Sequence, residues 1–140
     1  MDDIKLNIGE DYEIYGLDVK TWAEALTATC HGVAKVSGWW NNADPMTSMQ
    51  NPLHFSNKLC LIHSEISEAM EGDRKNLLDD KLPHRYMREV ELADAVIRIF
   101  DLAGGYGMDL AGAIAEKLAY NQQRADHKPE NRAQAGGKAY

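Results

Sequence analysis

The sequence predicts an all-α protein built as an antiparallel four-helix bundle. Four segments carry apolar residues at the three- and four-residue spacing of a helix face. Short connections between such segments favour antiparallel neighbours. A chain of 140 residues with 44% apolar content suits one domain with a single core, so we expect residues 1–140 to form one domain. The helical core is expected over about residues 19–124.

The first helix is expected to begin after Asp18 and to reach about Val36. Asp18 is a good N-cap, because its carboxylate can accept hydrogen bonds from amides of the first turn, and Gly38 is a stop signal. Residues 2–18 alternate loosely between polar and apolar, which predicts a short extended arm. The apolar positions of the first helix are Trp22, Leu26, Cys30 and Val33.

The second and third helices are expected to face the core with one apolar stripe each. The second begins near Ser56 and ends at Gly72. The third runs from Pro83, a favoured first helical residue, to the pair at 104–105. The stripes are Leu59, Ile62, Ile66 and Ala69 in the second helix and Leu92, Val96, Ile99 and Ala103 in the third.

A fourth helix is expected from Asp109 to about Arg124. From Asp126 onward polar residues and glycines dominate, as in the final GGKAY. Such a composition predicts a flexible tail over residues 125–140.

Two pairs of acidic residues lie at matching three-residue spacings on the flanks of the second and third stripes. Side chains three apart on a helix are neighbours, so each pair presents two carboxylates from one side of its helix. If the two helices pack antiparallel, the four carboxylates can meet. We call these four residues the acidic quartet: Glu65, Glu68, Glu91 and Asp94.

A quartet of carboxylates favours a bound cation. Clustered carboxylates raise one another's pKa and need protons or cations to stay ionised. Few basic residues are near in sequence, and the obvious ones are Arg74, Arg88 and Arg98. Oxygen ligands suit a hard ion, so Mg²⁺ is expected, with Mn²⁺ as the alternative. A solvated helix face remains the other interpretation of each pair.

The fourth helix carries a cationic and amide ladder. Lys117, Asn121 and Arg124 are spaced i, i+4, i+7 and therefore project from one stripe. Lysine and arginine bind phosphate, and asparagine can bind a sugar hydroxyl or a phosphate oxygen. An ordinary exposed helix face is the alternative interpretation.

The charge and hydropathy of the chain exclude some classes of partner. The net charge is −7 and the basic residues are spread along the chain, which argues against a nucleic-acid partner. Neither a long apolar run nor a charged-then-apolar leader occurs, so we expect no membrane association and a cytoplasmic protein.

Several phrases of the sequence together resemble a known family. They are GWW at residues 38–40, LIHSEISEA around the first acidic pair, ELADAVIRIFDLA around the second, and KLAYNQQR at residues 117–124. Over roughly residues 22–124 the chain resembles the MazG-like all-α nucleoside triphosphate pyrophosphohydrolases, in particular the compact forms of phages and bacteria. The family pattern EExxE followed by ExxD falls on the acidic quartet, with Ser64 in place of the first acid.

This resemblance implies hydrolysis of a (deoxy)nucleoside triphosphate to the monophosphate and pyrophosphate. It implies that the acidic quartet holds Mg²⁺ and that Lys117, Asn121 and Arg124 contact phosphates or sugar. Glu65 or Glu68 could accept the proton of the attacking water, as general-base catalysis requires. Arg74 is a weaker phosphate candidate. Trp39 and Trp40 are candidates for stacking on the base, with structural packing as an equal alternative.

The resemblance also bears on assembly and substrate. It implies a homodimer or homotetramer, since one short bundle encloses only part of a nucleotide and leaves apolar flanks exposed. The expected base is a purine, with dGTP as the first candidate substrate. A pyrimidine base or broad specificity stays open. The expected role is control of nucleotide pools or supply of a monophosphate precursor.

Two other function classes remain as alternatives. The first is a non-enzymatic helical interaction or regulatory protein whose acids only keep it soluble. The second is a di-metal redox carboxylate bundle. That class needs Glu-x-x-His on two helices, and no glutamate of this chain has histidine three residues later.

Overall fold

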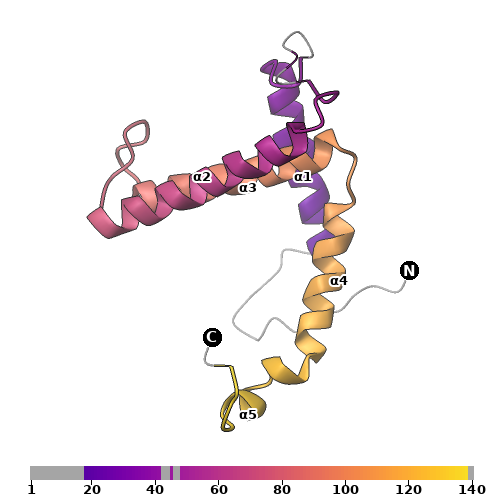
Figure 1. Ribbon diagram of the computed structural model, residues 1–140, viewed down its shortest axis with the longest axis vertical. Coiled ribbons are helices and arrows are strands. Elements are labelled where there is room, and N and C mark those ends of the chain that lie inside the picture. The colour runs from indigo at the N-terminus through magenta and orange to yellow at the C-terminus, as the bar shows by residue number, and fades with distance from the viewer. Residues whose placement is uncertain (1–17, 42–44, 46–47, 139–140) are drawn as a thin grey trace. The chain divides into compact units, whose positions relative to one another are not determined.

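The protein is all-α over the residues that the structure describes. The computed structural model describes residues 18–41, 45 and 48–138. The expected arm at residues 2–18 lies outside them, apart from Asp18. None of the described helices combines the length and the apolar character that crossing a membrane requires. The helices are α1 Val19–Val36, α2 His54–Lys75, α3 Met87–Gly105, α4 Leu110–Gln123, the 3₁₀ helix η1 Ala125–His127 and α5 Pro129–Arg132 (Figure 1).

The chain divides into two compact units. The first comprises residues 25–108 and contains α2, α3 and most of α1. The second comprises, among the described residues, 18–24 and 109–138, and contains α4, η1 and α5. The antiparallel four-helix bundle and the single domain stay predictions, whereas the all-α class is confirmed.

Helices α2 and α3 form an antiparallel helical hairpin, joined by a connector of residues 76–86 (Figure 1). Small residues line the seam between them, since Ala69 and Ala95 are buried. Gly72 is needed there because a Cβ at this position would lie 2.9 Å from Cβ of Met87. The missing side chain lets the first turn of α3 pack directly against the last turns of α2.

The ends of the hairpin helices differ from the expected ones. Helix α2 continues past Gly72 to Lys75, and Asn76 closes it in the left-handed region at φ 50°. Helix α3 begins at Met87 and not at Pro83, because the residues before it belong to the connector. There the amide of Met87 donates to the carbonyl of Leu77 at 3.0 Å, next to a bridge between residues 78 and 86.

The predicted apolar stripes are largely exposed, and this expectation was wrong. Only the alanines, Ala69 and Ala103, are buried. Leu59, Ile66, Leu92 and Val96 are between 41% and 50% exposed. The helices approach through small residues and through two buried glutamates, so the large side chains project outward.

A buried carboxylate ties the end of α1 to the hairpin. Oδ1 of Asp101 accepts a hydrogen bond from the indole Nε1 of Trp40 at 2.7 Å and lies 2.9 Å from Nδ1 of His31. The ammonium of Lys58 lies 3.8 Å from Oδ2 of the same residue. Close packing accompanies this contact, because a Cβ at Gly105 would collide with the ring of Trp40.

The second unit begins its long helix where the sequence predicts it. The carboxylate of Asp109 caps α4 by accepting from the amide of Gly112 at 2.9 Å. Beyond α4, residues 125–138 contain two short helices that the sequence does not predict. Asp126 holds this segment together, since it pairs with Arg124 and with Lys138, each at 2.6 Å.

Candidate metal centre

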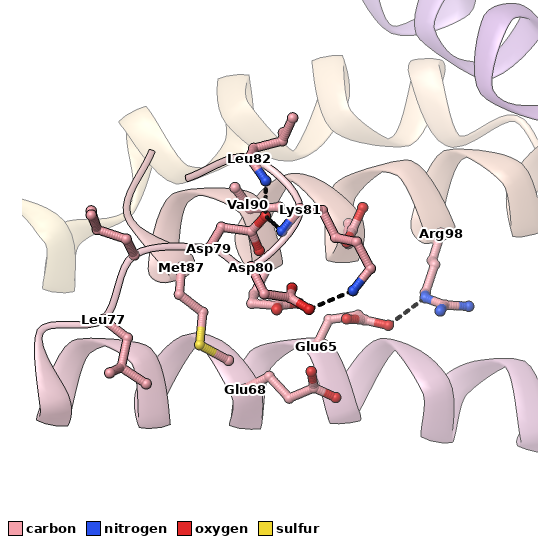
Figure 2. A pocket seen from close by; sticks show the side chains of 13 residues that line it. Glu65, Glu68, Leu77, Asp79, Asp80, Lys81, Leu82, Met87, Val90 and Arg98 are labelled. Atoms are coloured by element: carbon pink, nitrogen blue, oxygen red, sulfur yellow. Dashed lines mark hydrogen bonds and ion pairs between the residues drawn. The ribbon is translucent and has the colours of Figure 1, made fainter. Parts of the chain in front are cut away.

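The acidic quartet converges in the seam of the helical hairpin. One carboxylate oxygen each from Glu65 on α2 and from Glu91 and Asp94 on α3 lie within 4.8 Å of one another. Glu68, also on α2, lines the same cavity, of about 860 Å³ (Figure 2). We call this space the acidic cavity. The structure therefore brings together three of the four carboxylates, and Glu68 is exposed and lies outside this close group.

The local sequence explains why these acids face inward. Three-residue spacing puts both members of a pair on one side of their helix, and small neighbours such as Ala69 and Ala95 let the two helices approach. Glu65 and Glu91 become almost fully buried as a result, with 6% and 8% of their surface exposed. Asp94 is more exposed and lies at the edge of the group.

Burial and mutual repulsion hold protons on this group. Burial, a hydrogen bond with the carboxyl of Glu65 and the charges of Glu68, Glu65 and Asp94 raise the pKa of Glu91 to about 7. Burial and the charge of Glu65 also raise the pKa of Asp94, against the opposing effect of Arg98. Without a cation, a proton at Glu91 therefore relieves the repulsion near neutral pH.

Arg98 forms an ion pair with the quartet. Its Nε donates to Oε1 of Glu65 at 2.6 Å (Figure 2). Arg98 comes from α3, one turn after Asp94, so the pair crosses the seam. The guanidinium neutralises part of the charge of Glu65 while 44% of the Arg98 side chain stays exposed.

The connector forms another wall of the acidic cavity and adds a residue that the sequence interpretation missed. Asp79 is buried, and its Oδ1 accepts from the amides of Lys81 at 3.0 Å and Leu82 at 2.6 Å (Figure 2). This is the turn that aspartate forms with the backbone two and three residues on, so DDKLP was the available signal. Asp79 shapes the wall and also helps to raise the pKa of Asp94.

The donor set fits a hard divalent cation. Among the described residues the close group contains carboxylates alone, without histidine or cysteine. Mg²⁺ binds oxygen at roughly 2.0–2.1 Å in octahedral geometry, so ligand oxygens lie about 4 Å apart when opposite and about 3 Å apart when adjacent. The three oxygens, now within 4.8 Å of one another, would have to move closer together to bind one ion. Replacing the proton at Glu91 by such a cation would satisfy all three carboxylates.

The aromatic candidates divide into two environments. Trp40 is held by its hydrogen bond to Asp101, and its ring packs edge-on against His31, His54 and Tyr106. Trp39 is 70% exposed and lines a second cavity of about 710 Å³ in the same unit. We call this space the Trp39 cavity. Of the two tryptophans, Trp39 is the more exposed.

The remaining candidates lie away from the acidic cavity or in the other unit. Arg74 is exposed, pairs with Glu71 at 3.4 Å and does not line the cavity. In α4, the ammonium of Lys117 lies 4.8 Å from the ring centre of Tyr120. Arg124 marks the end of this helix and is bound to Asp126.

Asn121 on α4 has an unusual environment. Its side-chain oxygen is buried and has no hydrogen-bond partner among the described residues. A buried polar atom of this kind is costly unless a ligand or water satisfies it.

Comparison of the chain with protein-family models, with curated proteins and with solved structures finds no match. The likeness to the MazG-like enzymes therefore rests on the sequence motifs and stays a prediction.

Proposed function

We propose that the protein hydrolyses a (deoxy)nucleoside triphosphate to the monophosphate and pyrophosphate with the help of Mg²⁺. One observation carries the proposal: carboxylate oxygens of Glu65, Glu91 and Asp94 lie within 4.8 Å of one another beside a large cavity. The motifs around these residues, which resemble those of the MazG-like pyrophosphohydrolases, support the same reaction. Mn²⁺ is the alternative ion.

The residues of the quartet take different roles in this proposal. Glu65, Glu91 and Asp94 hold the cation. A bound Mg²⁺ would neutralise phosphate charge, orient the phosphate chain and lower the pKa of a bound water. Glu68 is the better candidate for the general base, because it lines the cavity outside the close group and has no hydrogen-bond or ion-pair partner among the described residues. Its carboxylate can therefore accept the proton of the attacking water.

Other residues are proposed for the substrate. Lys117, Asn121 and Arg124 are proposed to bind phosphate or sugar, and the unsatisfied oxygen of Asn121, which accepts hydrogen bonds, supports a donor such as a sugar hydroxyl at that residue. Trp39 is proposed to stack on the base, with dGTP as the first substrate to test. Trp40 and Arg74 are weaker candidates, because both are engaged within the protein. A homodimer or homotetramer is proposed as the working assembly.

The reaction is tested by incubating the protein with each of the eight common NTPs and dNTPs plus Mg²⁺ and identifying the products. We expect monophosphate and pyrophosphate from at least one of them. Release of orthophosphate with a diphosphate left over would contradict the proposed bond cleavage.

The roles of the acids are tested by substitution. Glu68→Gln and Asp94→Asn each remove one carboxylate with little change in size, and we expect kcat to fall by at least about 100-fold in each. Circular dichroism should show unchanged helix content. If both variants keep parental activity, these residues do not serve the reaction.

A non-enzymatic interaction protein is the second candidate function. It is favoured by the exposed apolar side chains of the hairpin, which include Leu59, Ile66, Leu92 and Val96. Calorimetry separates the two candidates: binding of neither Mg²⁺ nor any nucleotide would leave the interaction protein as the better explanation. The redox alternative is not favoured, because the close group contains no histidine.

A further inference from the structure

Two cavities of the first unit meet at one turn of α3. The acidic cavity and the Trp39 cavity share two lining residues, Asp94 and Arg98. These residues are spaced i, i+4 and are therefore neighbours on the helix surface. The side chain of Arg98 thus borders both spaces at once.

The two cavities differ in chemistry. The acidic cavity holds the quartet, which suits a cation and the phosphates bound to it. The surface of the Trp39 cavity is mostly apolar and suits a flat, uncharged group, although the charged residues Lys58 and Asp101 also line it. Its apolar lining includes Cys30, Val33, Trp39, Leu61 and Ile97. A nucleotide likewise joins a flat base to a charged phosphate chain, with the sugar and the phosphate nearest to it in between.

Arg98 has donors to spare at this junction. Its Nε is used by Glu65, while its two Nη groups have no hydrogen-bond partner among the described residues. A guanidinium offers five N–H donors in a planar fork, and a phosphate accepts from two of them at once. Arg98 can therefore keep its bond to Glu65 and bind a phosphate with its outer edge.

We propose that Arg98 binds the sugar-proximal phosphate of the nucleotide and so sets which phosphate lies beside the cation. The inference rests on the proposed function and names a substrate-binding residue for it. One consequence separates it from a structural role. Arg98 competes with the cation for the charge of Glu65. Removing the Arg98 side chain should therefore leave Glu65 free to bind metal, while it weakens the binding of the nucleotide.

The test compares Arg98→Ala and Arg98→Lys with the parent and with Arg88→Ala. Arg88 is a matched control from the same helix, because it pairs with Asp73 at 3.1 Å and lines neither cavity. The nucleotide is the one hydrolysed fastest in the substrate screen. Calorimetry gives the affinities for Mg²⁺ alone, for the corresponding nucleoside monophosphate and for pyrophosphate, the last two with Mg²⁺ present.

For Arg98→Ala we expect KM and the dissociation constant of the monophosphate to rise about tenfold or more, which is the size of a lost charged hydrogen bond. Affinity for Mg²⁺ alone should be unchanged or tighter, and affinity for pyrophosphate should stay within about twofold. Arg98→Lys should recover part of the loss, and Arg88→Ala should behave as the parent.

Two results would overturn the inference while the proposed function stands. One is a KM and monophosphate affinity within twofold of the parent in Arg98→Ala. The other is an equal loss of Mg²⁺ and nucleotide affinity, which would show that Arg98 only maintains the fold of the quartet. If the parent itself neither binds Mg²⁺ nor hydrolyses any nucleotide, the proposed function fails and this inference falls with it.

Discussion

Glu91 shows how strongly one side chain of this protein depends on its neighbours. It is buried beside Glu65 and Asp94, and its pKa is raised from 4.5 to about 7. The folded state therefore holds a proton between these two pH values that the unfolded state has lost. As pH rises through this window the metal-free protein loses stability, by about 3 kcal/mol in all.

The variant Glu91→Gln should remove this pH dependence. In the presence of a chelator we expect it to match the parent near pH 4.5 and to exceed it by up to about 3 kcal/mol at pH 8, because no carboxylate has to be ionised. Urea unfolding followed by circular dichroism at both pH values measures this. Equal stability of the two proteins at pH 8 would contradict the raised pKa.

Added Mg²⁺ should stabilise the protein at high pH, where the metal-free protein is less stable, and not at low pH. Binding requires ionised carboxylates, so we expect Mg²⁺ to stabilise the parent at pH 8 and to have little effect at pH 4.5. Thermal unfolding with and without the ion measures the effect, with Glu91→Gln as the variant that should respond less. Stabilisation of equal size at both pH values would point to binding elsewhere.

Among single residues, the sequence predicted that Glu65, Glu91 and Asp94 come together, and the structure shows this, but it did not predict what surrounds them. The matching spacing of Glu65 with Glu68 and of Glu91 with Asp94 was enough, since helix geometry converts it into convergence. Asp79 could not be placed in the same way. Its position depends on how the connector turns back over the cavity, and no periodicity records that.

The helices themselves show which boundaries a sequence can specify. Asp18 and Asp109 cap their helices through their own side chains, in the first case by accepting from the amide of Thr21 at 2.8 Å. Such caps are local and were predictable. The start of α3 at Met87 was not, because it depends on contacts with the residues that follow α2.

Two glycines on helices should respond oppositely to the same substitution. Gly105→Ala puts a methyl group into the ring of Trp40 and should destabilise the protein by about 1–3 kcal/mol. Gly32→Ala has open space around it within α1 and should stabilise by about 0.5–1 kcal/mol through helix propensity. Urea unfolding of both variants is the measurement. A neutral Gly105→Ala would show that α3 does not pack closely on Trp40.

The whole molecule exposes more apolar surface on its hairpin than its sequence predicts. The large members of the expected stripes lie outside, and alanines and acids occupy the seam. Apolar periodicity predicts that a face will be covered, but it does not say whether the cover comes from the same chain. This is why helix identity could be predicted and the composition of the core could not.

Self-association should cover part of this surface. We expect light scattering of the parent to give a multiple of 15.7 kDa. The double variant Ile66→Glu, Val96→Glu should shift the mass toward a single chain, because charged side chains would be buried in the interface. Ser67→Glu, an exposed change on the same helix, is the control and should leave the mass unchanged. A parent of 15.7 kDa at working concentration would contradict the predicted assembly.

The different settings of Trp39 and Trp40 give these two of the three tryptophans separate uses as intrinsic fluorophores. The indole of Trp40 is fixed by Asp101, so its emission reports whether α1 is docked on the hairpin. Trp39 lines the Trp39 cavity and is 70% exposed, so its emission is open to quenching by whatever enters that cavity. A protein with Trp22→Phe and Trp40→Phe would keep Trp39 as its one tryptophan. Its fluorescence could then follow the binding of a ligand during a titration.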